Sequence, residues 1–203
     1  MVFHAVSESP DDVAESEPAP ITGTLGADLR ALRTARGLTL GEMAEALGRS
    51  VGWLSQVERD ISTPRMRDIE AMARVLGVSR SILFGAAAPR DGEAGRIVRA
   101  DTRRVLGERH GGLVESLLSP DLTDDFEVIH STFQPGSARH EPIERPTQEL
   151  AYLVSGKLDV WLGENRFTLG PGDSLRVRGE RLRWANPYDT PAIAIWVIAP
   201  PVY

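Results

Sequence analysis

The 203-residue sequence predicts two domains of different fold class, an N-terminal all-α domain of five helices and a C-terminal all-β barrel. Apolar residues recur at helical spacing up to residue 84, whereas short β-branched runs separated by Gly, Pro, Asn and Asp follow residue 96. A small, polar stretch with Pro and Gly separates the two patterns. The predicted parts are an acidic disordered tail (1–21), a helical domain (22–85), a linker (86–95) and a barrel (96–203).

The centre of the helical domain is predicted to form two short helices joined by a tight turn. Thr39 N-caps the first of them, and Glu42 three residues later closes a capping box. Gly48 can take the left-handed conformation that ends a helix, and Ser50 N-caps the next one. Because Ala44 is small, the two helices can cross closely and leave the first turn of the second helix exposed. This layout is the one that places a helix in the major groove of DNA.

Three further helices are predicted around this pair. The first contains Leu25, Leu29 and Leu32 and precedes Gly37. A later one takes Thr63 as its N-cap and Pro64 as its first residue. Its apolar face begins at Met66, and a short fifth helix is predicted to start at Ser79.

Composition and charge narrow the class of protein. The chain has no cysteine, which excludes disulfides, zinc fingers and a thiol nucleophile. We expect a cytoplasmic protein, because no secretory signal and no apolar stretch of about 20 residues is present. The net charge is −6, yet residues 22–85 carry nine arginines against seven acidic residues. The bulk charge therefore does not exclude nucleic acid as a partner.

The segment LTLGEMAEALGRSVGWLSQVERDISTP resembles the core of the XRE-type helix-turn-helix regulators, a family that includes phage repressors. The resemblance implies a recognition helix at Ser50–Arg59 and a Glu58–Arg33 pair that locks two helices and orients Arg33 toward the DNA backbone. Gln56 suits adenine, since an amide both donates and accepts in the major groove. Trp53 is expected either to stack on the DNA backbone or to cover the edge of the core. The residues predicted to bind DNA are Arg33, Arg49, Ser50, Val51, Gly52, Trp53, Gln56, Arg59, Ser62 and Arg65.

The C-terminal half resembles a cupin, a small β-barrel of two sheets. The segments PGSARHEPIERPTQELAYLVSGKLDVWL and LGPGDSLRVRGERLRWANP match the two motifs of that family. Metal-binding cupins hold their ion with histidines and a carboxylate, but Pro142 and Leu182 stand at two of the histidine positions. Only His140 and Glu149 remain, and a divalent ion usually needs three or more protein ligands. We therefore expect no metal, no other cofactor and no catalytic residue.

A barrel without metal chemistry is expected to bind a small metabolite. The arginines near one turn predict an anionic ligand held by bidentate contacts, although alternating arginines on a strand also suit a solvated face. The residues predicted to bind the ligand are His140, Glu149, Tyr152, Arg176, Arg178, Arg183 and Trp184. Residues 96–109 are expected to form the edge strand of the barrel or to contact the DNA flanks.

Together these patterns predict a sequence-specific transcriptional regulator, a repressor by default. Its expected partners are a pseudo-palindromic double-stranded DNA operator, a second copy of the chain and an unidentified small-molecule effector. The alternative is an enzyme, similar to bacterial iron-dependent epoxidases, in which the helical domain does not bind DNA. That chemistry requires two histidines and a carboxylate around the iron.

Overall fold

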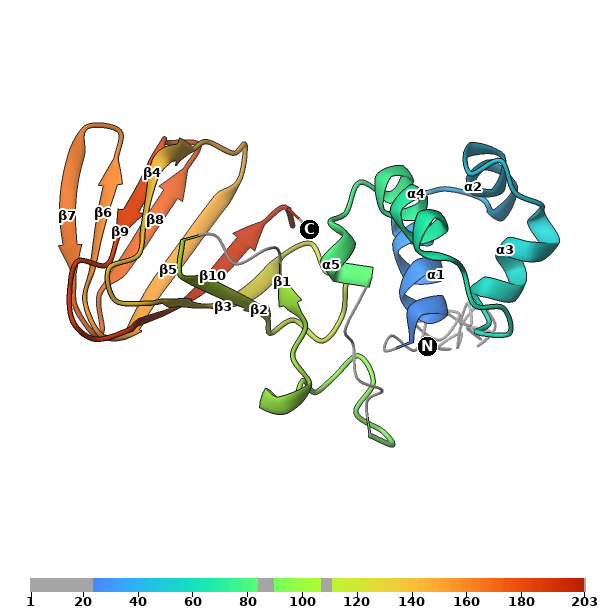
Figure 1. Ribbon diagram of the computed structural model, residues 1–203, viewed down its shortest axis with the longest axis horizontal. Helices are drawn as coiled ribbons and strands as arrows, with labels where there is room; N and C mark the ends of the chain where they lie inside the picture. Colours follow the sequence, from blue (N-terminus) through green and yellow to red (C-terminus); the bar gives the residue numbers. More distant parts are fainter. Residues whose placement is uncertain (1–23, 84–89, 107–110, 203) are drawn as a thin grey trace, which may run out of the picture.

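The structure, a computed structural model, describes residues 24–83, 90–106 and 111–202 (Figure 1). The predicted acidic tail lies outside the described residues, as do residues 86–89 of the predicted linker. Helices gather at one end of the molecule and strands at the other, so the two-domain layout is confirmed. The exact boundaries between the domains stay a prediction.

Four helices of seven to eleven residues form the N-terminal domain, and a single four-residue turn follows them. Their bounds are α1 Leu25–Ala35, α2 Leu40–Ala46, α3 Val51–Val57, α4 Met66–Leu76 and, for the short turn, α5 Arg80–Leu83. The predicted count of five helices is therefore not confirmed.

The predicted caps of the central pair are present. The Glu42 backbone N–H donates to Thr39 Oγ1 at 3.2 Å, and the Thr39 N–H donates to Glu42 Oε2 at 2.8 Å. The Ser50 hydroxyl accepts from the Trp53 N–H at 3.2 Å. The predicted start of the fourth helix was wrong by two residues. Its N-cap is Arg65, whose N–H donates to Asp68 Oδ2 at 3.2 Å, so the chain enters the helix after Pro64.

The core of the helical domain extends into the β region. Leu29, Leu54 and Met72 are completely buried at its centre. Leu117 and Leu122 belong to the same apolar cluster, although both follow the predicted linker. The two domains therefore pack against each other through shared apolar contacts.

The C-terminal region folds into two antiparallel sheets. Six strands are arranged in the order β1-β2-β3-β10-β5-β8, and four in the order β4-β9-β6-β7. The strands of the large sheet are β1 Val105–Leu106, β2 Leu113–Leu117, β3 Glu127–Phe133, β10 Ala192–Ala199, β5 Gln148–Ser155 and β8 Ser174–Arg178. Those of the small sheet are β4 Ala138–Ile143, β9 Leu182–Ala185, β6 Leu158–Leu162 and β7 Asn165–Leu169. Phe133 and Trp184 join the sheets in the core, with ring centroids 4.7 Å apart.

The pattern of β-branched residues predicted most strands but was wrong at two places. Residues 96–100 form no strand. Backbone N–H groups of Arg96 and Ile97 donate to the Glu93 carbonyl and close the turns of residues 91–96, and the 3-10 helix η1 Ala100–Thr102 begins shortly afterwards. Of the predicted edge strand, residues 107–109 lie outside the described residues, and within the described part only Val105–Leu106 pairs with β2. Strand β4 was missed, because its sequence, ARHEPI, lacks apolar alternation and contains a proline.

Within the described residues, no helix is long and apolar enough to cross a membrane.

Candidate DNA-binding surface and ligand cavity

The second half of α3 is anchored in the core, and its first turn is exposed to solvent. Leu54 and Val57 anchor the helix in the core, whereas Val51, Gly52 and Gln56 are exposed. A Cβ added at Gly52 would meet nothing within 4 Å, so this position leaves room for a neighbouring molecule. The structure therefore brings three of the residues predicted to bind DNA together on one exposed surface.

Exposed arginines flank this surface. Arg59 follows α3 and Arg65 precedes α4, and both are exposed, whereas Ser62 between them is partly buried. Ile61 and Met66 are also exposed here, by 64% and 58%. Sequence reasoning missed Ile61 and wrongly placed Met66 on the buried face of α4. Met66 has the apolar spacing of that face, but it occupies the first helical position and points away from the core.

Arg33, which was predicted to bind DNA, is engaged by partners within the protein, so its contact with DNA stays a prediction. Its Nε and Nη2 donate to the two carboxylate oxygens of Glu58 at 2.6 and 3.0 Å, and its Nη1 donates to the Leu38 carbonyl at 2.7 Å. The two side chains are only 13% and 5% exposed. The predicted ion pair is thus confirmed, but it uses the guanidinium to hold α1 against the end of α3.

Arg49 is held at the start of α3 by two neighbours. Its Nη2 lies 2.5 Å from Asp68 Oδ1, and its guanidinium lies 4.9 Å from the centroid of the Trp53 ring. The Arg49 hydrogen bond lowers the pKa of the Asp68 carboxyl below its ordinary value, despite the opposing effect of burial. Trp53 is partly buried against the helical core, so it covers the core's edge as one of the two alternatives predicted.

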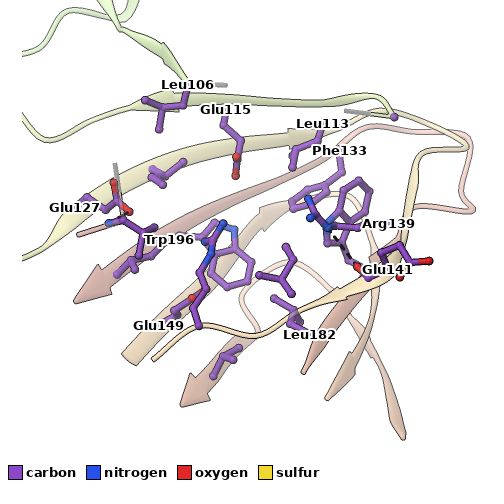
Figure 2. Close-up of a pocket in the computed structure, with 18 of the residues that line it drawn as sticks. Leu106, Leu113, Glu115, Glu127, Phe133, Arg139, Glu141, Glu149, Leu182 and Trp196 are labelled. Carbon is purple, nitrogen blue, oxygen red and sulfur yellow. Dashed lines mark hydrogen bonds between the residues drawn. The ribbon is translucent and has the colours of Figure 1, made fainter. Parts of the chain in front are cut away.

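A cavity of about 690 Å³ opens between the two sheets and the helical domain (Figure 2). That volume is typical of small-molecule sites. Its floor contains Phe133, Trp184 and Trp196 from the barrel, and Ser79 and Ile82 line it from the helical side.

Three of the seven predicted ligand-binding residues, His140, Glu149 and Trp184, line this cavity. The other four residues predicted to bind the ligand, Tyr152, Arg176, Arg178 and Arg183, do not line this cavity. Each of these side chains occupies an outward-facing position on its strand, because its neighbours in sequence face the core. On β8, Leu175 and Val177 are buried and the two arginines are exposed, so the arginines belong to the solvated face.

Carboxylates dominate the charged lining of the cavity. The described lining residues include five glutamates but only two arginines. Glu115, Glu127 and Glu149 approach from strands β2, β3 and β5 (Figure 2). Glu127 is 1% exposed. Burial raises the pKa of its carboxyl, and Glu115 and Glu149 add to this effect, while the Val202 N–H and Arg145 oppose it.

Sequence reasoning missed Glu115 and Glu127. Glu127 lies two residues before Ile129 on a strand whose alternate residues are buried, so the period of two could have placed it inside. Glu115 gave no comparable indication, because β2 is only partly buried along its length.

The residues present do not fit a metal centre. In the described residues no three His, Asp or Glu side chains are grouped to hold an ion. His140 is exposed, and Leu182, at one expected histidine position, is buried in the core. Among the residues that the structure describes, the two histidines and one carboxylate that the enzyme alternative requires are therefore not brought together.

The raised pKa of Glu127 can be tested through the pH dependence of the protein's stability. Because its folded pKa lies above the value of 4.5 for a free carboxyl, the folded state binds more protons above pH 4.5. Stability must then fall as pH rises through this window. We expect Glu127→Gln to remove part of that fall, measured as melting temperature between pH 4.5 and 8. The exposed Glu164→Gln is the control, and a Glu127→Gln profile parallel to that of the wild type would contradict the assignment.

Comparison with known proteins agrees with this geometry. The model of the helix-turn-helix domain family matches residues 24–81, and that of the cupin domain family matches residues 129–198. The chain is 22% identical over 152 residues to the HTH-type transcriptional regulator PuuR of Escherichia coli, covering 75% of this chain and 81% of that protein. The chain belongs to the XRE-type helix-turn-helix regulators with a cupin domain. It is a DNA-binding transcriptional regulator.

Two other similarities cover different parts of this regulator. The immunity repressor protein of Bacillus phage phi105 is 36% identical over 62 residues, which are 30% of this chain and 43% of the repressor. The structure of hydroxypropylphosphonic acid epoxidase from S. wedmorenis is 16% identical, with a TM-score of 0.44, and covers 89% of this chain and 99% of that one. The relatives in sequence are regulators, and the epoxidase is an enzyme.

Proposed function

We propose that this regulator binds its operator through the exposed turn of α3 and that the cavity between the domains holds a small-molecule effector. The observation that carries the proposal is the division of α3 into a buried half and a free first turn next to exposed arginines. No enzymatic step is assigned to the cavity, because its lining residues do not fit the metal that the enzyme alternative requires.

Each exposed residue of this surface has a role that suits its chemistry. The Gln56 amide forms paired hydrogen bonds with an adenine edge, and Val51 contacts a thymine methyl group. Arg59 and Arg65 neutralise phosphates and fix the register of the helix on the duplex. Arg49, held by Asp68 and Trp53, adds a positioned positive charge at the start of α3.

We propose that the regulator acts as a homodimer and represses transcription by occupying promoter DNA. The outer face of the large sheet carries exposed apolar side chains on neighbouring strands, which are typical of an association surface. They are Leu150, Tyr152, Val154 and Val197. A second copy packed on this face removes them from water. Such a dimer offers two α3 helices to half-sites about 34 Å apart on a pseudo-palindromic operator.

The proposal is tested by selecting bound sequences from random double-stranded DNA with the full-length protein. We expect a palindromic consensus. Gln56→Ala should lower affinity for it by about 5- to 150-fold, equivalent to about 1–3 kcal/mol, and relax the preference at one base pair in each half-site. Arg59→Ala should weaken binding to all sequences equally and reduce the salt dependence by about one phosphate contact.

The matched control is Gln134→Ala, which removes an exposed glutamine from the barrel instead. All affinities must be measured at one salt concentration, because phosphate contacts depend strongly on it. Unchanged affinity in a Gln56→Ala, Arg59→Ala double variant would refute the assignment of α3 as the recognition helix.

A further inference from the structure

We propose that the cavity binds an organic amine cation with an apolar body, and that this ligand controls how firmly the helical domain is held against the barrel. The coupling to DNA rests on the proposed function, whereas the binding of the amine does not. The inference replaces the anionic metabolite that the arginine-rich turn suggested.

The charge of the lining favours a cation. Glu127 and Glu149 are 1% and 7% exposed, yet both face the cavity. Each already accepts one hydrogen bond at Oε1, from the Val202 N–H at 3.0 Å and from the Thr147 hydroxyl at 2.7 Å. Withdrawing carboxylates from water costs free energy unless a positive partner is supplied. An ammonium group is such a partner, and it donates up to three hydrogen bonds.

The lining arginines do not reverse this preference. Arg145 already interacts with Glu127, and Arg139 Nε donates to the Glu141 carbonyl at 3.3 Å. The arginines that would have favoured an anion, Arg176 and Arg178, lie on the solvated face of β8. An anion in the cavity would meet an excess of carboxylates.

The walls and the size of the cavity are independent of these charges and also indicate a ligand. A cavity of about 690 Å³ between two packed domains exceeds the small voids that close-packed interiors contain. Its walls include Phe133, Trp184 and Trp196, whose ring faces attract cations and whose area suits an apolar body. Trp196 and Glu149 lie on the paired strands β10 and β5, two register positions apart, and both line the cavity, so an apolar surface and a carboxylate lie on the same wall (Figure 2).

The cavity also touches the elements that join the two domains. Ile82 lines the cavity from α5, and Leu106 lines it from β1 while packing against the helical core. Arg104, next to β1, donates to the Ile82 carbonyl and pairs with Asp28 of α1. We call these contacts of Arg104 the interdomain clasp. A ligand that fills the cavity therefore contacts Ile82, which is hydrogen-bonded to Arg104, and Leu106, which lies two residues after it.

The binding arm of the test uses calorimetry on the full-length protein. The probes are alkyl monoamines and diamines of three to six carbons, with the alcohol and carboxylate of equal length as controls. We expect at least one amine to bind ten-fold or more tightly than its matched alcohol, and carboxylates to bind no better than alcohols. Glu127→Gln and Glu149→Gln should each weaken amine binding, whereas exposed Glu164→Gln should not. Tighter binding of a carboxylate, or no amine exceeding its alcohol, overturns the inference.

The coupling arm uses hydrogen exchange, which does not depend on DNA binding. The amine should slow exchange of the amides of residues 79–83 and 104–106 by several-fold in the wild type. Arg104→Ala should abolish this protection while calorimetry still detects binding of the amine. If the alanine variant does not fold, Arg104→Lys, which keeps the charge, replaces it in the same two measurements. Protection confined to the barrel overturns the coupling.

A third measurement separates failure of this inference from failure of the proposed function. The affinity for the selected DNA is measured with and without the amine, and a change of at least five-fold is expected. Unchanged affinity in a protein that binds both DNA and amine overturns the coupling and leaves the regulator assignment standing. Absence of DNA binding overturns the regulator assignment, while calorimetry and exchange still decide the amine.

Discussion

Replacing Glu58 with alanine is expected to destabilise the helical domain by about 3–5 kcal/mol. The substitution removes the carboxylate that accepts from Nε and Nη2 of Arg33, and it leaves a guanidinium that is only 13% exposed. A buried charge without its partner is among the costliest defects in a protein core. The free energy of unfolding is measured in urea, with helical circular dichroism as the signal.

The matched control is the exposed ion pair of the same domain. Arg80 Nη1 lies 2.9 Å from Glu70 Oε1, with side chains 59% and 41% exposed. Glu70→Ala should cost less than about 1 kcal/mol, because solvent screens such pairs. Equal losses for Glu58→Ala and Glu70→Ala would show that burial does not distinguish the two pairs. Glu58→Ala should reduce DNA binding only in proportion to the fraction unfolded.

The barrel has a comparable point of failure at Gly156. A Cβ at this position would lie 2.3 Å from the Pro191 carbonyl oxygen and 2.7 Å from the Ala192 Cα, and both atoms belong to the backbone. The φ angle of 77° adds strain for any L side chain. We expect Gly156→Ala to cost about 2–5 kcal/mol, from roughly 1–2 for the conformation and 1–3 for the displaced backbone. Tryptophan fluorescence during urea unfolding reports on the barrel.

Gly163→Ala isolates the contribution of the conformation. This residue also has a positive φ, 58°, but an added Cβ there would meet nothing within 4 Å. We expect a loss of about 1–2 kcal/mol. If Gly156→Ala and Gly163→Ala lower the free energy of unfolding equally, the contact with Pro191 does not contribute to the loss and the prediction is wrong.

Local chemistry explains why the helices could be predicted. The capping hydrogen bonds of Thr39, Glu42 and Ser50 join residues that are three positions apart, so these helix starts can be predicted from the sequence. The Arg33–Glu58 pair followed from the family resemblance. That the pair buries Arg33 depends on the packing of α1 against α3, which no local pattern contains.

The cavity was harder to predict, because it is built from residues far apart in the chain. Glu115, Glu127 and Glu149 become neighbours only through the pairing of β2 with β3, and of β10 with β3 and β5. The alternation on β8 already favoured a solvated face for its arginines, and the expectation of an anionic ligand ran against that pattern. The alternation of polar and apolar residues assigns side chains to the two faces of a strand. It does not predict which side chains from different strands meet in the cavity.

The shared core has a consequence for engineering this protein. Leu117 and Leu122 complete the apolar cluster of the helices, and Arg104 reaches Asp28 across 76 positions. A chimera that joins these helices to a foreign sensor at residue 86 would omit that support. The unit that must be transferred is therefore discontinuous in sequence. It consists of the DNA-binding helices together with Arg104, Leu117 and Leu122, which follow the predicted linker.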